Sequence, residues 1–172
     1  MNTGQTMLAV GAMMLLSFLV LRFNSVHITS AQASYNAKFG IVATSLANSL
    51  IEEAKDKAFD ELVLDTTKTI LSANDFSSIL NKETGEVYPD FDDFDDYNNL
   101  FYLDSLSLKD PQTGLPTKFE IRSKVNYVTD VSPDVNSASR QYHKKITVAV
   151  YCSALVDTIR LSSIFSFWTL LE

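Results

Sequence analysis

The chain has 172 residues, 46% of them hydrophobic, and a formal net charge of −7. Nucleic-acid binding depends mainly on clustered Lys and Arg, which this acidic sequence lacks, so we expect no nucleic-acid partner. The single cysteine, Cys152, excludes an intramolecular disulfide. The length predicts one compact domain beside any segment that lies in lipid.

The first 21 residues carry no charged side chain, and residues 7–21 are a nearly continuous apolar run. A run of this kind is typical of a helix that lies in lipid or in the dry core of an assembly. We therefore expect this segment to anchor the chain in a membrane and to join it to other copies. The side chains expected to make these contacts are Met7, Leu8, Val10, Met14, Leu15, Leu16, Phe18 and Leu19.

Beyond Arg22 the helical pattern continues but becomes amphipathic. Apolar residues recur every four positions, which is the spacing of one helix face: Val42, Leu46, Leu50, Ala54, Ala58 and Leu62, flanked by Phe39, Ala43, Ala47, Ile51 and Phe59. Because no turn signal interrupts the pattern, we predict one helix over residues 7–62, with Gly40 as a candidate bend. Residues 1–24 are then the membrane or filament segment, and residues 25–172 form a head domain.

Residues 65–99 show no clear period and are expected to connect the helix to the rest of the domain. Within this connector we expect a short helix over residues 75–80, capped by Asn74 or Asp75. Phe76, Ile79 and Leu80 are expected to pack against the long helix.

Five aspartates fall within seven residues of the connector, at Asp90, Asp92, Asp93, Asp95 and Asp96. Calcium is bound by several oxygen ligands, which closely spaced carboxylates can supply, although the glycine and the distal glutamate of an EF-hand loop are missing. One interpretation is a calcium site made by these aspartates. The other is a solvated acidic loop held in place by Phe91, Phe94 and Tyr97, which we favour, so no cofactor is expected.

From residue 100 onward the apolar period changes to two, which predicts half-buried strands. The four strands expected lie at residues 101–108, 119–127, 146–152 and 159–167. Residues 110–114 predict a hairpin connection, and residues 130–139, with Pro133, a longer loop. The strands would form an antiparallel meander whose apolar face is covered by the long helix, giving an α+β fold.

No catalytic motif stands out. His143 and Cys152 are nine residues apart on one predicted strand, so they should face opposite sides and not form a nucleophile and base. His27 lies in the polar transition of the long helix and is expected to be solvated or at an interface. The sequence has no phosphate-binding glycine loop, no H-E-x-x-H and no G-x-S-x-G, and we expect no enzymatic activity.

A short leader ending in Gly4, an uncharged apolar segment and a long helix packed on an antiparallel sheet resemble the type IV pilins and the pseudopilins of type II secretion. The resemblance implies that a prepilin peptidase cuts after Gly4 and leaves Gln5 as the new N-terminus. The first-turn glutamate of that family falls on Ala9 here.

The resemblance also implies a function. The chain would enter the inner membrane as a precursor and then, with the pilus assembly machinery, join a helical filament of identical subunits on the cell surface. Two alternatives stay open: a membrane-anchored binding domain that uses its acidic loop, and a pseudopilin of a secretion system.

Overall fold

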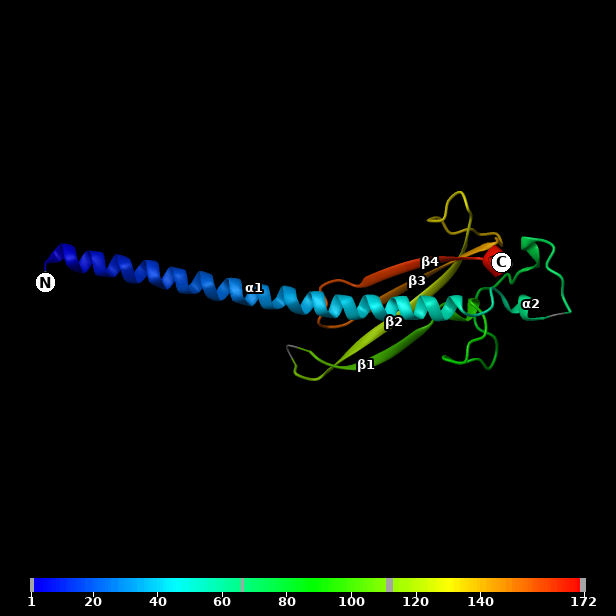
Figure 1. Cartoon of the computed structure of the whole chain (residues 1–172), viewed down its shortest axis with the longest axis horizontal. Coiled ribbons are helices and arrows are strands. Elements are labelled where there is room, and N and C mark those ends of the chain that lie inside the picture. The colour runs from blue at the N-terminus through cyan, green and yellow to red at the C-terminus, as the bar shows by residue number, and fades with distance from the viewer. Residues whose placement is uncertain (1, 66, 111–112, 171–172) are drawn as a thin grey trace. The chain divides into compact units, whose positions relative to one another are not determined.

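The computed structural model describes residues 2–65, 67–110 and 113–170, with the backbone alone at residues 169 and 170 (Figure 1). A helix, α1 (Thr3–Lys55), is followed by a single helical turn, α2 (Glu61–Leu64), and four strands: β1 (Phe101–Lys109), β2 (Pro116–Val128), β3 (His143–Tyr151) and β4 (Ile159–Ser166). The chain divides into two compact units, Met1–Lys38 and Phe39–Glu172. The fold is therefore α+β, as expected.

The four strands form one sheet in the order β1-β2-β3-β4, with every neighbouring pair antiparallel. This is the predicted meander, and each predicted segment overlaps one strand. Along each strand, every second side chain points to the inner face of the sheet. On this face Ile121 pairs with Val150 and Val148 pairs with Leu161, and all four side chains are buried or half-buried. Residues 111 and 112 of the predicted hairpin connection lie outside the described residues.

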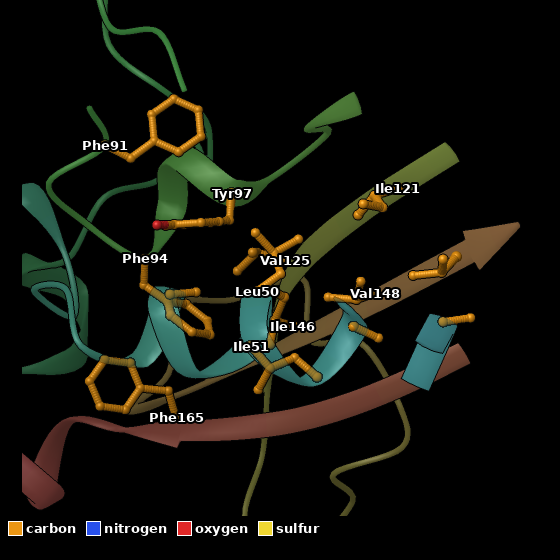
Figure 2. Packing of buried hydrophobic residues seen from close by; sticks show 14 of the residues in the cluster. Leu50, Ile51, Phe91, Phe94, Tyr97, Ile121, Val125, Ile146, Val148 and Phe165 are labelled. Atoms are coloured by element: carbon orange, nitrogen blue, oxygen red, sulfur yellow. The ribbon is translucent and has the colours of Figure 1, made fainter. Parts of the chain in front are cut away.

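The C-terminal part of α1 covers the inner face of this sheet and builds the core with it (Figure 2). The buried helix residues are Phe39, Ala43, Ala47, Leu50, Ile51 and Ala54. Three of these six residues are alanines, so the large buried side chains of the helix are those of Phe39, Leu50 and Ile51. Val42 and Leu46 belong to the apolar row predicted at every fourth position, but they are only partly buried and pack against the core. Full burial of one large apolar side chain contributes about 1.5–3 kcal/mol.

The helix ends at Lys55, seven residues before the predicted end at Leu62. The reason is a backbone pairing with the acidic loop: the Ala58 N–H donates to the Asp92 carbonyl (3.1 Å), and the Phe94 N–H donates to the Ala58 carbonyl (2.9 Å). A helical Ala58 could not make both bonds, because its N–H and carbonyl would be directed along the helix axis. Tertiary contacts thus override the apolar pattern here.

The short helix predicted over residues 75–80 is wrong. The structure has a single 3₁₀ turn at Ala73–Asp75, and the Asp75 carboxylate accepts hydrogen bonds from the N–H groups of Leu71 and Ser72, both at 2.8 Å. Asp75 therefore closes the turn that precedes it. Phe76 is buried in the core as expected, whereas Ile79 is 77% exposed and lies outside the core.

Candidate functional site

The apolar segment of α1 presents large hydrophobic side chains on all sides. Every side chain expected to make membrane or assembly contacts is exposed, as are these further ones: Met13, Val20, Leu21, Phe23, Val26 and Ile28. None of the described side chains of residues 3–38 is buried. A helix that is apolar all round requires lipid or other protein around it, and α1 is long and apolar enough to cross a membrane.

Two hydroxyl groups in the first part of α1 bond to the backbone of the same helix. The Ser17 hydroxyl donates to the Met13 carbonyl (2.8 Å), and the Thr29 hydroxyl donates to the Ser25 carbonyl (3.0 Å). Such bonds remove the cost of placing a hydroxyl in an apolar environment. The residues expected at the processing site, Gly4 and Gln5, lie in the first turn of α1, where the Gln5 N–H donates to the Asn2 carbonyl (2.8 Å).

The acidic loop differs from the prediction of a solvated loop. Its expected anchors are confirmed, because Phe91, Phe94 and Tyr97 are all buried (Figure 2). However, Asp93, Asp95 and Asp96 are at most 1% exposed, and only Asp90 and Asp92 face solvent. The loop is therefore part of the core.

Two of the buried carboxylates fold the loop on itself. Asp93 Oδ1 accepts hydrogen bonds from the N–H groups of Asp95 (2.6 Å) and Asp96 (3.1 Å). Asp96 Oδ2 accepts from the N–H groups of Asp92 (3.1 Å) and Asp93 (3.3 Å). Backbone N–H groups thus stabilise charges whose burial would otherwise be costly.

A buried lysine completes this region. Lys144, in β3, is fully buried, and its Nζ lies 2.8 Å from Asp60 Oδ2, 2.6 Å from Asp95 Oδ1 and 2.7 Å from the Phe59 carbonyl oxygen. The Phe59 ring centroid is 4.4 Å away, and that of Tyr127 is 5.4 Å away. We call Lys144, Asp60 and Asp95 the buried charge centre.

The two carboxyl groups of the buried charge centre differ in their surroundings. Burial raises the pKa of Asp60, but Lys144 and hydrogen bonds from Ser77 outweigh this and hold the pKa below its ordinary value. Burial raises the pKa of Asp95 to about 8, despite the attraction of Lys144. One cation therefore balances one carboxylate, and at neutral pH the second carboxyl group is held as the neutral acid.

The sequence pattern contained a signal for Lys144 that the prediction missed. Lys144 has the same parity on its strand as Ile146, Val148 and Val150, all of which point to the core. A lysine in register with a buried row predicts a buried partner carboxylate. Its partners, Asp60 and Asp95, lie in distant parts of the chain, so the sequence pattern could not predict which carboxylates pair with Lys144.

The five aspartates of the predicted calcium site do not converge on one point. Among the described residues, only one group of three acidic side chains places its oxygens within 4.8 Å of one another, at Glu83, Glu86 and Asp96. Partial desolvation raises the pKa of Glu83, although its side chain is exposed, and a hydrogen bond with Glu86 adds to the effect. Calcium binding stays the untested alternative to the expectation of no cofactor, and Asp96 is the single predicted ligand that lies in this group.

We expect the melting temperature to be the same in calcium and in chelator. The physical reason is that Asp93 and Asp96 are already bonded to backbone N–H groups and that Asp95 contacts Lys144, so the loop needs no cation to fold. Thermal unfolding followed by circular dichroism measures this. A calcium-dependent rise would contradict the expectation, and its loss in Glu86→Gln would place the ion in the group of three.

Stability is expected to fall as pH rises from about 4 to about 6. Burial raises the pKa of Asp93 from an ordinary value of 3.8 to about 6 in the folded chain. In this interval the folded state keeps a proton that the unfolded state releases, so the stabilisation is lost as pH rises, by on the order of 2 kcal/mol. Urea unfolding at several pH values measures the slope, and Asp93→Asn, which keeps the accepting oxygen, should reduce it. A slope unchanged in this variant would contradict the assignment.

The structure does not bring the other candidate reactive residues, His143, Cys152 and His27, together. His143 begins β3, and Cys152 follows its last residue, so the two lie at opposite ends of the strand. Cys152 is buried, and burial raises the pKa of its thiol. His27 is exposed on α1 and contacts the Phe23 ring edge to face, with centroids 4.9 Å apart.

In comparisons with known proteins, no family model, no curated protein and no solved structure matches this chain. The chain is thus an α+β protein in which a long N-terminal helix with an apolar first part packs, by its last turns, on an antiparallel sheet. This architecture is compatible with that of the pilins.

Proposed function

We propose that this protein is the structural subunit of a type IV pilus-like filament and that it polymerises through the apolar part of α1. The observation that carries the proposal is the charge-free helical segment whose large side chains are all exposed. In the cell these side chains must be covered, first by lipid and then by the same segments of neighbouring subunits.

Transfer from lipid to a filament has a simple physical basis. Lipid tails are as apolar as leucine, so a helix leaves the membrane only when an equally apolar surface replaces it. A bundle of identical helices provides that surface. Gly11 and Ala12 leave room for close approach, and a Cβ added at Gly11 would meet nothing within 4 Å. Stacking by a screw operation that does not close gives a filament in place of a ring.

The head has a core of its own, which suits a subunit that is exposed outside the cell. The resemblance to pilins and pseudopilins adds an inner-membrane precursor, a prepilin peptidase that acts after Gly4, and an assembly machinery. A pilus and a secretion pseudopilus are both assembled through this helix, and we propose the surface filament. The alternative, a membrane-anchored binding domain, would use the acidic loop, yet three of its five carboxylates are buried.

Cysteine cross-linking tests the helix packing directly. Ala12→Cys places a thiol in the apolar segment, while the natural Cys152 is buried and serves as the internal control. We expect oxidation of intact cells to convert Ala12→Cys subunits to disulfide-linked dimers, while the wild-type chain stays monomeric on a denaturing gel. Monomers in both strains would contradict a bundle of apolar helices.

Deletion of residues 1–24 is expected to leave a soluble, monomeric domain. All of the buried α1 side chains lie between Phe39 and Ala54, so the deletion removes no core residue. We expect the unfolding free energy of this domain to match that of the full chain in detergent to within about 0.5 kcal/mol. Sedimentation and urea unfolding measure this. Aggregation or loss of structure would mean that the apolar segment belongs to the domain's own core.

A further inference from the structure

Three reactive groups meet in a space from which water is excluded. Lys144 and Asp60 are fully buried, Asp95 is 1% exposed, and Nζ of Lys144 lies within 2.8 Å of an oxygen of each carboxyl group. The rings of Phe59 and Tyr127 complete the enclosure. A desolvated lysine amine is a nucleophile, and a fixed contact with its target replaces a bimolecular encounter.

The two carboxyl groups are held differently. Asp60 accepts hydrogen bonds from the N–H and the hydroxyl of Ser77 and from the N–H of Leu62. Asp95 Oδ1 contacts only the lysine, and within the described residues its Oδ2 has no hydrogen-bond partner. A buried carboxyl oxygen without a partner is costly in a structure that serves packing alone. Conversion of Asp95 to an amide would leave one uncharged oxygen in place of the two carboxyl oxygens.

We propose that Lys144 and Asp95 join in an isopeptide bond that forms spontaneously in the folded chain, with Asp60 as the proton acceptor. This bond would tie the acidic loop covalently to β3. The sequence offers one cysteine and therefore no intramolecular disulfide, so the amide would supply a covalent link that the chain otherwise lacks. The inference does not depend on the filament proposal.

The reaction balances without an added reagent. Asp60, as the carboxylate, takes one proton from the Lys144 ammonium group, and the neutral amine attacks Cγ of Asp95, which is present as the carboxylic acid. This attack forms the C–N bond and gives a tetrahedral intermediate. Collapse of the intermediate breaks one C–O bond and releases one water molecule. The second amine proton leaves with that water, and Asp60 remains as the neutral acid beside the new amide. Water exclusion favours this direction, because the released water leaves the apolar site.

Intact-mass measurement of the full wild-type chain, purified in detergent and fully denatured, tests the bond. We expect the chain, whether it begins at Met1 or at Gln5, to be lighter than the corresponding sequence by the mass of one water molecule. The result does not depend on the folding of any variant. A mass equal to that of the unmodified sequence would overturn the proposal.

Tryptic peptides then assign the partners. Asp95 lies in peptide 83–109, Asp60 in peptide 58–68, and Lys144 in peptide 141–145, with a missed cleavage at the modified lysine. We expect peptide 83–109 to be joined to peptide 141–145, and fragmentation to place the link on Asp95. A link to peptide 58–68 would overturn the assigned roles.

A matched pair of variants completes the test. Lys144→Met should restore the full sequence mass, whereas Lys145→Met, which replaces the neighbouring half-buried lysine, should keep the loss of water. If Lys145→Met also restored the full mass, or Lys144→Met kept the loss, the modification would lie elsewhere and the proposal would fail.

Discussion

Lys144→Met is expected to destabilise the head domain by at least about 3–5 kcal/mol, which is the usual effect of removing one partner from a buried ion pair, and loss of the proposed amide bond would add to this. The methionine side chain fills much of the same space, but Asp60 and Asp95 lose the cation that lies within 2.8 Å of both. The acidic loop loses its attachment to β3 at the same time. Urea unfolding of the domain that lacks residues 1–24 measures the change.

Lys145→Met is the control for this variant. Lys145 is half-buried and lies 3.7 Å from Asp134, whose side chain is fully exposed, so its loss should cost about 0–1 kcal/mol. The double variant Lys144→Met with Asp60→Asn should recover part of the lost stability, because it removes the orphaned carboxylate. Equal stability of the two single variants would show that the buried charge centre contributes little to the fold.

Leu16→Asp is expected to abolish filaments. Leu16 is 61% exposed in the single chain, within the apolar part of α1. A charge at the centre of a membrane helix costs about 2.5–3.5 kcal/mol on the insertion scale, and in a filament the cost recurs in every subunit. The head domain should fold as before, because Leu16 makes no contact with its core. Electron microscopy and the amount of sheared surface material measure the loss.

Leu71→Asp provides the matched control, since it places the same charge on a leucine that is 84% exposed in the connector. We expect this variant to assemble. Fibres formed by Leu16→Asp in normal amount would show that the subunits associate through another surface, and failure of both variants would point to a general effect on folding or export.

The parts of the fold with strong periodicity were predictable from sequence. Alternation in residues 119–127 and 146–152 identified the central strands, because one face of an antiparallel sheet is wet and the other is dry. The apolar segment was equally predictable, because a helix without charged side chains is not expected to lie in water. In both cases the signal is local, so no knowledge of distant residues was needed.

The acidic loop was misjudged because its environment is set by residues far away in sequence. A cluster of five aspartates is usually solvated. In this chain three of the five are buried, and their burial depends on Lys144, which is distant along the chain, and on the backbone at Ala58. The end of α1 was misplaced for the same reason, since Ala58 continues the apolar period but pairs with Asp92 and Phe94. The predicted calcium ligands were Asp90, Asp92, Asp93, Asp95 and Asp96. The sequence pattern could not show that the last three are buried and the first two are exposed.

Electron microscopy of material sheared from the surface of cells that make the wild-type chain tests the central proposal most directly. Assembly through a shared apolar helix predicts long fibres with a helical repeat, and mass spectrometry of the same sample should identify this chain as the main component. Cells without fibres, from which the chain is recovered only as dispersed particles in detergent, would contradict the proposal and favour a membrane-anchored single domain.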